Sequence, residues 1–130
     1  MSSAADEVAA AMTAEWGAAF ATVDADALCR LYSKSALFYG SNPTLYRGRD
    51  GVKSYFAALP RWKTSSVRFS DVMTSAAGDD LVNMAGTANF LVDGSPLTVK
   101  ITWVIIREDG AWKIVSHHVS SKAPLIDEVR

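Results

Sequence analysis

The second half of the chain consists of four long strand-like segments, separated by short turns that are rich in Asp and Gly. These segments are Ser66–Ser75, Leu81–Val92, Leu97–Arg107 and Ala111–Ser120. The pairs Asp93-Gly94 and Asp109-Gly110 stand between apolar runs, which is a strong local signal for a hairpin. The pattern therefore predicts an antiparallel meander, and this feature constrains the fold more than any other in the sequence.

An amphipathic helix is predicted near the start of the chain. Its apolar stripe repeats every three or four residues, at Val8, Met12, Trp16, Phe20 and Val23. With 3.6 residues per turn, this spacing places the five side chains on one face of a helix of about four to five turns. Such a face is normally buried, so the helix is expected to pack on the predicted sheet.

Two further helices are predicted before the meander. Asp24 is expected to cap a short second helix, and Asp50 is expected to cap a third helix, which ends at Pro60. A short strand is predicted over Ala36–Gly40, between these two helices. Helices followed by an antiparallel meander indicate the α+β class, with one sheet covered on one face by helices.

The two faces of the predicted sheet differ in chemistry, because side chains alternate along a strand. The inward positions are almost wholly apolar, whereas the outward positions are semi-polar and suit a protein–protein contact. The outward residues predicted for this contact are Thr87, Asn89, Thr102, Val104, Ser116, His118 and Ser120. Trp112 and Ile114 share the outward phase, and a bulge early in the last segment would turn them inward; both alternatives stay open.

A bent sheet under three helices tends to leave a conical cavity, and Gly86 in the middle of a long strand favours a strong bend. Many of the residues expected around this space are aromatic, and aromatic concavities with few polar groups are the usual sites for small ligands. The alternative is a fully packed core without a cavity. The residues predicted to line the pocket are Trp16, Phe20, Tyr32, Phe38, Tyr55, Phe56, Met84, Gly86, Phe90, Trp103, His117 and Val119.

His117 is the only clearly polar side chain among the inward positions of the sheet, and a histidine titrates near neutral pH. Together with Tyr32 or Tyr55, it is a candidate for general acid/base catalysis or for a hydrogen bond to a ligand. The alternative is a buried histidine that is bonded to one of these tyrosines. His117 and His118 point to opposite faces of a strand and cannot share an ion, so no metal is predicted. The sequence has no Gly-rich phosphate loop and no dinucleotide fingerprint, and no cofactor is predicted.

Composition excludes several classes of partner. The 13 Lys and Arg residues and 14 Asp and Glu residues give a net charge of -1, which offers no basic surplus for nucleic acid or an anionic membrane. No apolar run, Trp103–Ile106 included, approaches the ~20 residues of a membrane span. A single Cys residue and an N-terminus without the basic region of a signal peptide predict a reducing, cytoplasmic context.

The C-terminal part of the sequence resembles a known family. The run Asp109–Pro124 resembles the close of the calmodulin-dependent kinase II association-domain-like proteins, which belong to the SnoaL-like branch of the nuclear transport factor 2 superfamily. With the segments upstream, the resemblance covers residues 8–124. It implies that residues 1–130 form a single SnoaL-like domain.

Upstream segments extend the resemblance. Arg47–Val52, followed by Tyr55-Phe56 and Leu59-Pro60, resembles the Gly-plus-helix segment of the family. Trp16–Asp24, followed by Leu31-Tyr32, resembles its first helix and the start of its second. The family implies a cone-shaped α+β fold of the cystatin-like, nuclear transport factor 2-like type, in which three helices cover a strongly curved, mixed or antiparallel sheet. It also implies a homodimer through the convex sheet face.

The resemblance does not imply one activity, because the superfamily includes isomerases, polyketide cyclases, dehydratases, transport factors and kinase hub domains. Many relatives open the first strand with an Asp pair, where this chain reads Ser33-Lys34-Ser35-Ala36. The positions that match the inward arginines of the kinase hub are Gly86, Trp103 and Val119. The catalytic carboxylates and the arginine clamp of these relatives are therefore not expected here.

The sequence favours a small-molecule-binding protein whose aromatic cavity takes a compact apolar or aromatic ligand, with His117 and a tyrosine as polar anchors. The first alternative is an isomerase, cyclase or dehydratase, in which His117 acts as general acid/base and a tyrosine hydroxyl steadies an oxyanion. The second alternative is an association module that binds no ligand. Whether the protein is an enzyme stays open at this point.

Overall fold

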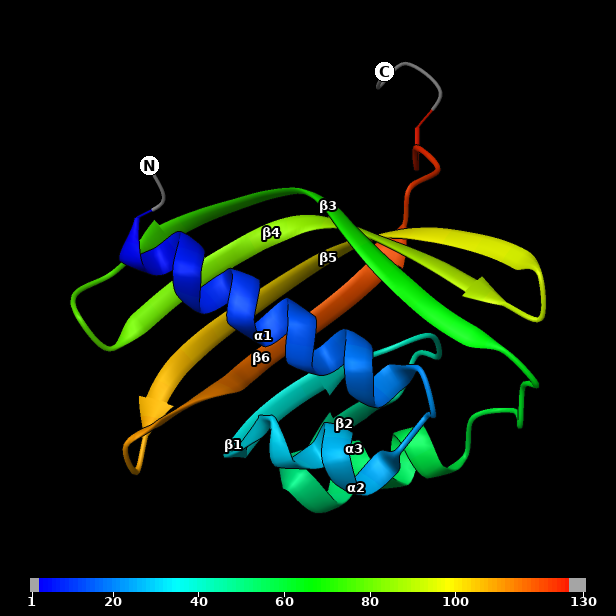
Figure 1. The fold of residues 1–130 in the computed structure, drawn as a ribbon, viewed down its shortest axis with the longest axis horizontal. Helices are drawn as coiled ribbons and strands as arrows, with labels where there is room; N and C mark the ends of the chain where they lie inside the picture. Colours follow the sequence, from blue (N-terminus) through cyan, green and yellow to red (C-terminus); the bar gives the residue numbers. More distant parts are fainter. Residues whose placement is uncertain (1–2, 127–130) are drawn as a thin grey trace.

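Residues 3–126 of the computed structural model form three helices and six strands (Figure 1). The helices are α1 (Ala4–Phe20), α2 (Ala25–Arg30) and α3 (Gly48–Ala57). The strands are β1 (Tyr32–Tyr39), β2 (Leu45–Arg47), β3 (Ser65–Ala76), β4 (Leu81–Val92), β5 (Ser95–Glu108) and β6 (Ala111–Ser121). The last four strands coincide with the predicted meander, and their bounds differ from the predicted ones by at most two residues.

The strands of this part of the chain form one mixed sheet in the order β2-β1-β6-β5-β4-β3. The pairs within the meander are antiparallel, and so is the pair β1–β2, whereas β1 runs parallel to β6. β1 begins four residues before the predicted strand, and the short β2 was not predicted at all. The predicted α+β class with a curved sheet is confirmed.

The three helices cover the concave face of the sheet. In Figure 1, α1 lies across the long strands, where it contacts β3 and β4, while α2 and α3 lie together beside β1. Met12, Trp16 and Phe20 of the predicted stripe are buried under the sheet, and Val8 is partly buried. Val23 lies beyond the end of α1, in the turn before α2, where its φ is 46°.

A bulge in β3 bends the sheet opposite Gly86. Ser70 pairs with Thr87 and Met73 pairs with Ala85, so two residues of β3, Asp71 and Val72, lie opposite the single residue Gly86. A bulge of this kind bends a strand and increases its twist. A Cβ atom on Gly86 would lie 3.2 Å from Val72 Cα, so the bulged strand approaches more closely than a larger residue would allow.

A second bulge, in β6, settles the alternative that the alternating pattern leaves open. Val104 pairs with Ser116 and Ile105 pairs with Ile114, so the intervening Val115 has no partner of its own. The extra residue reverses the phase of the strand, and Ile114 is fully buried in the core. Trp112 is half-buried, and the guanidinium of Arg107 lies 4.6 Å from the centroid of its ring.

The helix caps agree with the prediction for α2 and differ from it for α3. Asp24 caps α2, because its Oδ1 accepts a hydrogen bond of 3.0 Å from the backbone N–H of Ala27. The prediction of Asp50 as a cap is wrong: α3 follows directly on β2, with Arg47 at the cap position, and Asp50 lies in the first turn. There its negative charge still favours the positive end of the helix dipole.

No helix within residues 3–126 combines the length and the apolar character that crossing a membrane requires.

Candidate functional site

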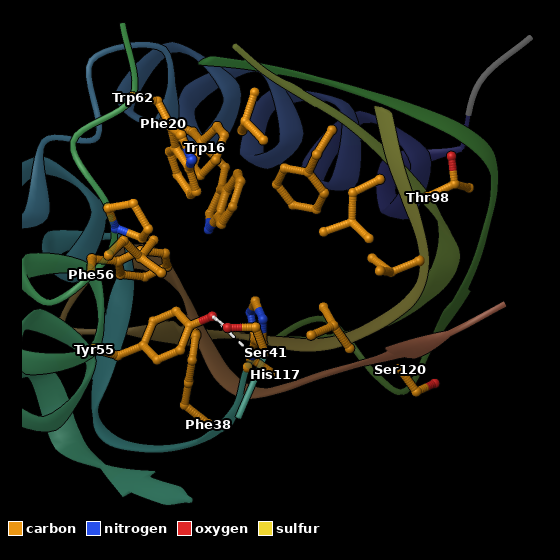
Figure 2. A pocket seen from close by; sticks show the side chains of 18 of the residues that line it. Trp16, Phe20, Phe38, Ser41, Tyr55, Phe56, Trp62, Thr98, His117 and Ser120 are labelled. Atoms are coloured by element: carbon orange, nitrogen blue, oxygen red, sulfur yellow. Dashed lines mark hydrogen bonds between the residues drawn. The ribbon is translucent and has the colours of Figure 1, made fainter. Parts of the chain in front are cut away.

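A cavity of about 590 Å³ lies between α1, α3 and the concave face of the sheet (Figure 2). Its volume falls within the range of about 300–1,000 Å³ that is usual for small-molecule sites. Seven of its lining residues are Trp, Phe or Tyr, and no Asp, Glu, Lys or Arg of the described chain lines it. The cavity is therefore a largely apolar space with several aromatic walls and no charged side chain from the described residues.

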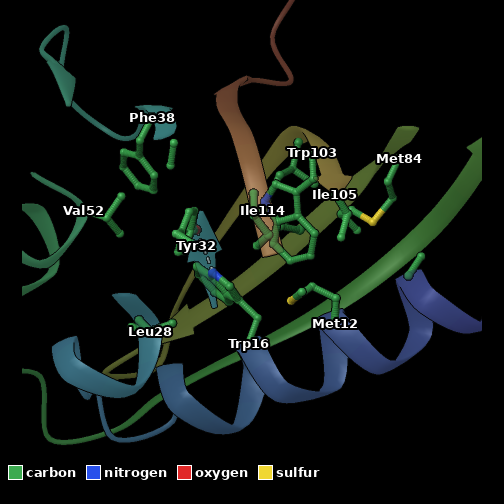
Figure 3. Close-up of a cluster of buried hydrophobic side chains, with 14 of the residues drawn as sticks. Met12, Trp16, Leu28, Tyr32, Phe38, Val52, Met84, Trp103, Ile105 and Ile114 are labelled. Carbon is green, nitrogen blue, oxygen red and sulfur yellow. Dashed lines mark hydrogen bonds between the residues drawn. The ribbon is translucent and has the colours of Figure 1, made fainter. Parts of the chain in front are cut away.

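Eight of the residues predicted for the pocket line this cavity. They are Trp16, Phe20, Phe38, Tyr55, Phe56, Phe90, His117 and Val119. The other four predicted residues do not line it, and for them the prediction is wrong: Tyr32, Met84, Gly86 and Trp103. The reason is that Trp16 of α1 packs toward Trp103, with ring centroids 6.1 Å apart, and fills the middle of the cone (Figure 3). The packed-core alternative therefore holds around Trp103, and the cavity lies on the other side of Trp16.

Sequence reasoning missed the residues that close the cavity around its rim. They are Gly40, Ser41, Leu59, Pro60, Trp62, Val92, Leu97, Thr98, Val99, Ser120 and Ser121. Most of these residues lie in the connection after α3 or at the ends of strands. In such places the alternation of side chains no longer tells which residues point inward and which point outward. The apolar character of the loop residues Leu59 and Trp62 is the one signal that could have indicated a buried role. Ser120 was predicted for the outer face, yet it also lines the cavity at the end of β6.

The remaining residues predicted for the outer face are mostly accessible. Thr102, Ser116 and His118 are exposed, and Asn89 and Val104 are half-buried. Thr87 is the exception, because it is 7% exposed and its hydroxyl accepts a hydrogen bond of 3.4 Å from Lys122 Nζ. Thr87 is therefore largely covered within the single chain, and its place in the contact stays a prediction.

His117 lies at the centre of a buried hydrogen-bond network. Its Nδ1 accepts a hydrogen bond of 2.9 Å from the indole Nε1–H of Trp103 and shares a second one, of 2.8 Å, with the hydroxyl of Tyr32. The Tyr32 oxygen in turn accepts a hydrogen bond of 2.9 Å from the indole Nε1–H of Trp16. The sequence alternative of a histidine bonded to a tyrosine is thus realised, with two tryptophans in addition.

This environment holds His117 in its neutral form. Burial lowers the pKa of His117 to about 3, and the charge of the neighbouring His118 contributes in the same direction. Burial also raises the pKa of the Tyr32 hydroxyl well above its ordinary value, despite the hydrogen bond from Trp16. Both groups therefore stay uncharged near neutral pH, as expected for polar groups in an apolar core.

The second ring nitrogen of His117 faces the cavity. His117 lines the cavity, and within residues 3–126 its Nε2 makes no hydrogen bond to protein. In the same part of the chain, no fully buried side-chain nitrogen or oxygen lacks a partner, so Nε2 is not enclosed by protein atoms. The ring of Phe38 stacks on the imidazole at a centroid distance of 4.1 Å and an angle of 23°, which fixes the plane of the ring.

A second polar group lies at the Tyr55 side of the cavity. The Tyr55 hydroxyl oxygen accepts a hydrogen bond of 2.8 Å from the backbone N–H of Ser41 and shares one of 2.6 Å with the Ser41 hydroxyl (Figure 2). Gly40 makes this approach possible, since a Cβ atom there would lie 2.5 Å from Tyr55 Cζ. Tyr55 is therefore a polar group on the cavity wall. Tyr32 does not line the cavity and contacts it only through its hydrogen bond to His117.

Within residues 3–126, no three His, Cys, Asp or Glu side chains are grouped so that they could hold a metal ion.

Comparisons with known proteins agree with this fold. The model of the SnoaL-like domain family matches residues 8–124. No protein with a curated description matches the chain. Among solved structures, a candidate calcium/calmodulin-dependent protein kinase II association domain from Xanthomonas campestris has a TM-score of 0.84 and 25% identity, with 96% of this chain and 91% of that chain covered.

Two more distant structures show the same fold. A candidate dehydratase of the NTF2-like family from Streptomyces avermitilis has a TM-score of 0.80 and 21% identity, with 91% of this chain and 96% of that chain covered. A domain with a cystatin-like fold from Nostoc punctiforme has a TM-score of 0.77 and 16% identity, with 95% and 82% covered. The chain, with its helix-covered mixed sheet, belongs to the SnoaL-like domain family and has the cystatin-like, nuclear transport factor 2-like fold.

Proposed function

We propose that the protein binds a compact apolar or aromatic small molecule in the cavity between α1, α3 and the sheet. The observation that carries this proposal is a space of about 590 Å³ that is walled by seven aromatic side chains and contains no charged one from the described residues. Cavities of this size and character bury most of the surface of a small ligand. The energy of binding would come chiefly from removal of apolar surface from water.

The aromatic walls support a preformed site. The rings of Trp16 and Phe20 stack at 5.3 Å, and Phe90 meets Phe20 edge-on at 5.0 Å. Phe38 packs against Tyr55 at 4.8 Å on the opposite side. Because each ring is held by another ring, a ligand would lose little free energy to ordering of the walls.

A thermal-shift screen of small aromatic compounds tests this proposal, with a variant that fills the cavity. A ligand at 100 times its dissociation constant adds about 2.7 kcal/mol to the free energy of unfolding, so binding is easily detected. Val119→Trp places an indole in the cavity and should abolish the shift. The matched control is Leu91→Trp, because Leu91 is 47% exposed and does not line the cavity. The proposal fails if no compound stabilises the protein, or if Val119→Trp responds as strongly as the control.

An isomerase, cyclase or dehydratase that uses His117 as general acid/base receives less support. Some solved proteins of this fold carry dehydratase names, but their low identity to this chain speaks only for the fold. A histidine whose pKa is lowered to about 3 is almost wholly unprotonated near neutral pH, so it cannot act as a general acid, and it is too weak a base to accept a proton readily. No carboxylate of the described residues lines the cavity, so none is placed there to act as general acid or base instead of His117.

We also propose that the convex face of the sheet packs against a second copy of the chain. This face carries Thr102, Ser116 and His118 as exposed side chains around the half-buried Val104. Its mixture of apolar and small polar groups resembles the composition of protein–protein interfaces. A two-fold contact would place the same residues opposite one another. An association module without a ligand would leave the aromatic cavity unused, so it is the less supported function.

A further inference from the structure

We infer that the cavity selects an uncharged ligand that carries a hydrogen-bond-accepting oxygen, and that this oxygen binds Nε2–H of His117. Trp103 and Tyr32 are positioning residues that fix this proton on Nε2. The inference rests on the proposed function, since it names the class of molecule that the proposed site takes.

The direction of each hydrogen bond in the network follows from the donors involved. An indole N–H can only donate, so Nδ1 of His117 must accept the bond of 2.9 Å from Trp103. Because this Nδ1 carries no proton, the Tyr32 hydroxyl must be the donor in its contact of 2.8 Å with Nδ1, while its oxygen accepts from the indole of Trp16. An imidazole that accepts at Nδ1 and is neutral carries its single proton on Nε2.

The protonated nitrogen faces an otherwise apolar wall. Phe38 covers one face of the imidazole at 4.1 Å, and Trp16 lies 6.5 Å from it, both measured between ring centroids. A purely hydrocarbon ligand would strip water from Nε2–H without replacing the lost hydrogen bond, and an unpaired buried donor is costly. A ligand with an oxygen acceptor at this point avoids that cost.

The lining of the cavity also disfavours a charged ligand. No Lys or Arg of the described residues lines the cavity to pair with an anion, and no Asp or Glu lines it to pair with a cation. His117 cannot supply a positive charge, because two donors already point at the nitrogen that would have to be protonated. A carboxylate or ammonium group would therefore be buried without a partner, which strongly opposes binding.

The tautomer can be measured without any ligand. A long-range ¹H–¹⁵N correlation spectrum of the ligand-free protein should show His117 with a protonated Nε2 and an unprotonated Nδ1 at neutral pH. In Trp103→Phe and in Tyr32→Phe, one of the two donors to Nδ1 is lost, so the resonance of Nδ1 should shift in each variant. Observation of a protonated Nδ1 in the wild-type protein would overturn the inference.

Binding is tested with three probes of similar frame: α-tetralone, tetralin and α-naphthoate, which are a ketone, a hydrocarbon and an anion. In His117→Asn, the short amide keeps an acceptor near Trp103 and Tyr32 but no longer reaches the cavity. The preference for α-tetralone over tetralin, measured as the ratio of their dissociation constants, should fall about tenfold in this variant, as expected for one well-placed hydrogen bond. The control Phe90→Leu should weaken both probes and leave the ratio unchanged.

The outcomes separate this inference from the proposed function. If α-tetralone and tetralin bind but their ratio is the same in His117→Asn, the inference fails while the binding cavity stands. The inference fails in the same way if α-naphthoate binds the wild-type protein as tightly as α-tetralone. If neither α-tetralone nor tetralin binds the wild-type protein, the inference fails, and the proposed function fails with it where no compound of the thermal-shift screen stabilises the protein.

Discussion

The indole Nε1–H of Trp103 and the Nδ1 atom of His117 are joined by a hydrogen bond of 2.9 Å in the core of the protein. This bond requires an unprotonated Nδ1, because an indole nitrogen has no lone pair to offer in return. Protonation of Nδ1 would turn its N–H group against the N–H group of Trp103 in a buried part of the core. The fold therefore opposes the charged form of His117, in agreement with its pKa of about 3.

The free energy of unfolding should fall as the pH is lowered below the ordinary pKa of histidine. Between pH 6.5 and about 3, the unfolded chain binds a proton at His117 that the folded chain does not bind, so acid favours the unfolded state. Each pH unit well inside this window costs about 1.4 kcal/mol, so the loss between pH 6.5 and 5 is on the order of 2 kcal/mol. Urea unfolding at several pH values measures it.

His117→Asn is the control for this pH dependence, because asparagine does not titrate. Glu108 protonates at lower pH, since the hydroxyl of Ser33 holds the pKa of its carboxyl below 4.5. The difference in slope between the wild-type protein and this variant, between pH 5 and 6.5, therefore isolates the contribution of His117. Equal slopes for the wild-type protein and the variant in this region would show that His117 is not a buried, neutral histidine.

Removal of the Tyr32 hydroxyl should destabilise the protein by about 1–3 kcal/mol. Tyr32→Phe keeps the ring but leaves the indole N–H of Trp16, a 2%-exposed residue, without its acceptor, and a buried donor that lacks a partner costs about this amount. Tyr46→Phe is the matched control, because its hydroxyl accepts only an exposed hydrogen bond from Asn42. That variant should stay within about 0.5 kcal/mol of wild type in chemical unfolding. Similar losses in the two variants would contradict the proposed network.

The sequence predicts the meander and the first helix well, because both are repeated local patterns. Alternation and Asp-Gly pairs define β3 to β6, and a stripe at helical spacing defines α1. The bulge at Val115 could be anticipated only as an alternative, since one extra residue reverses the phase without changing composition. β2 was missed because a three-residue strand is too short to show any period.

The site was predicted less completely than the fold. His117 and Tyr55 were found because they are polar residues in apolar surroundings. The alternation of side chains along a strand cannot show how closely a helix packs against the sheet. Trp16 fills the space over Trp103, so inward-facing residues such as Met84 became core rather than pocket wall. The depth of the cavity depends on this tertiary contact, which no local pattern encodes.

Gly86 should tolerate no side chain, whereas Gly17 should. In Gly86→Ala, the new Cβ would lie 3.0 Å from Val72 Cγ2 and 3.2 Å from the backbone oxygen of Ser70, so the bulged strand must shift. Overpacking of this kind costs about 1–3 kcal/mol. In Gly17→Ala, the nearest atom lies at 3.7 Å, and alanine within α1 should gain about 0.5–1 kcal/mol. Thermal unfolding should therefore move in opposite directions in the two variants, and a shift in the same direction would contradict the bulge geometry.

A charge at the centre of the convex face should dissociate the proposed homodimer. Val104 is half-buried between strands of this face, and Val104→Glu would bury a carboxylate in the contact without a partner. Light scattering should give twice the mass of one chain for the wild-type protein and a single-chain mass for the variant. Ala77→Glu, in the exposed turn between β3 and β4, should remain dimeric. A single-chain mass for the wild-type protein, or a dimer that survives Val104→Glu, would exclude this face as the interface.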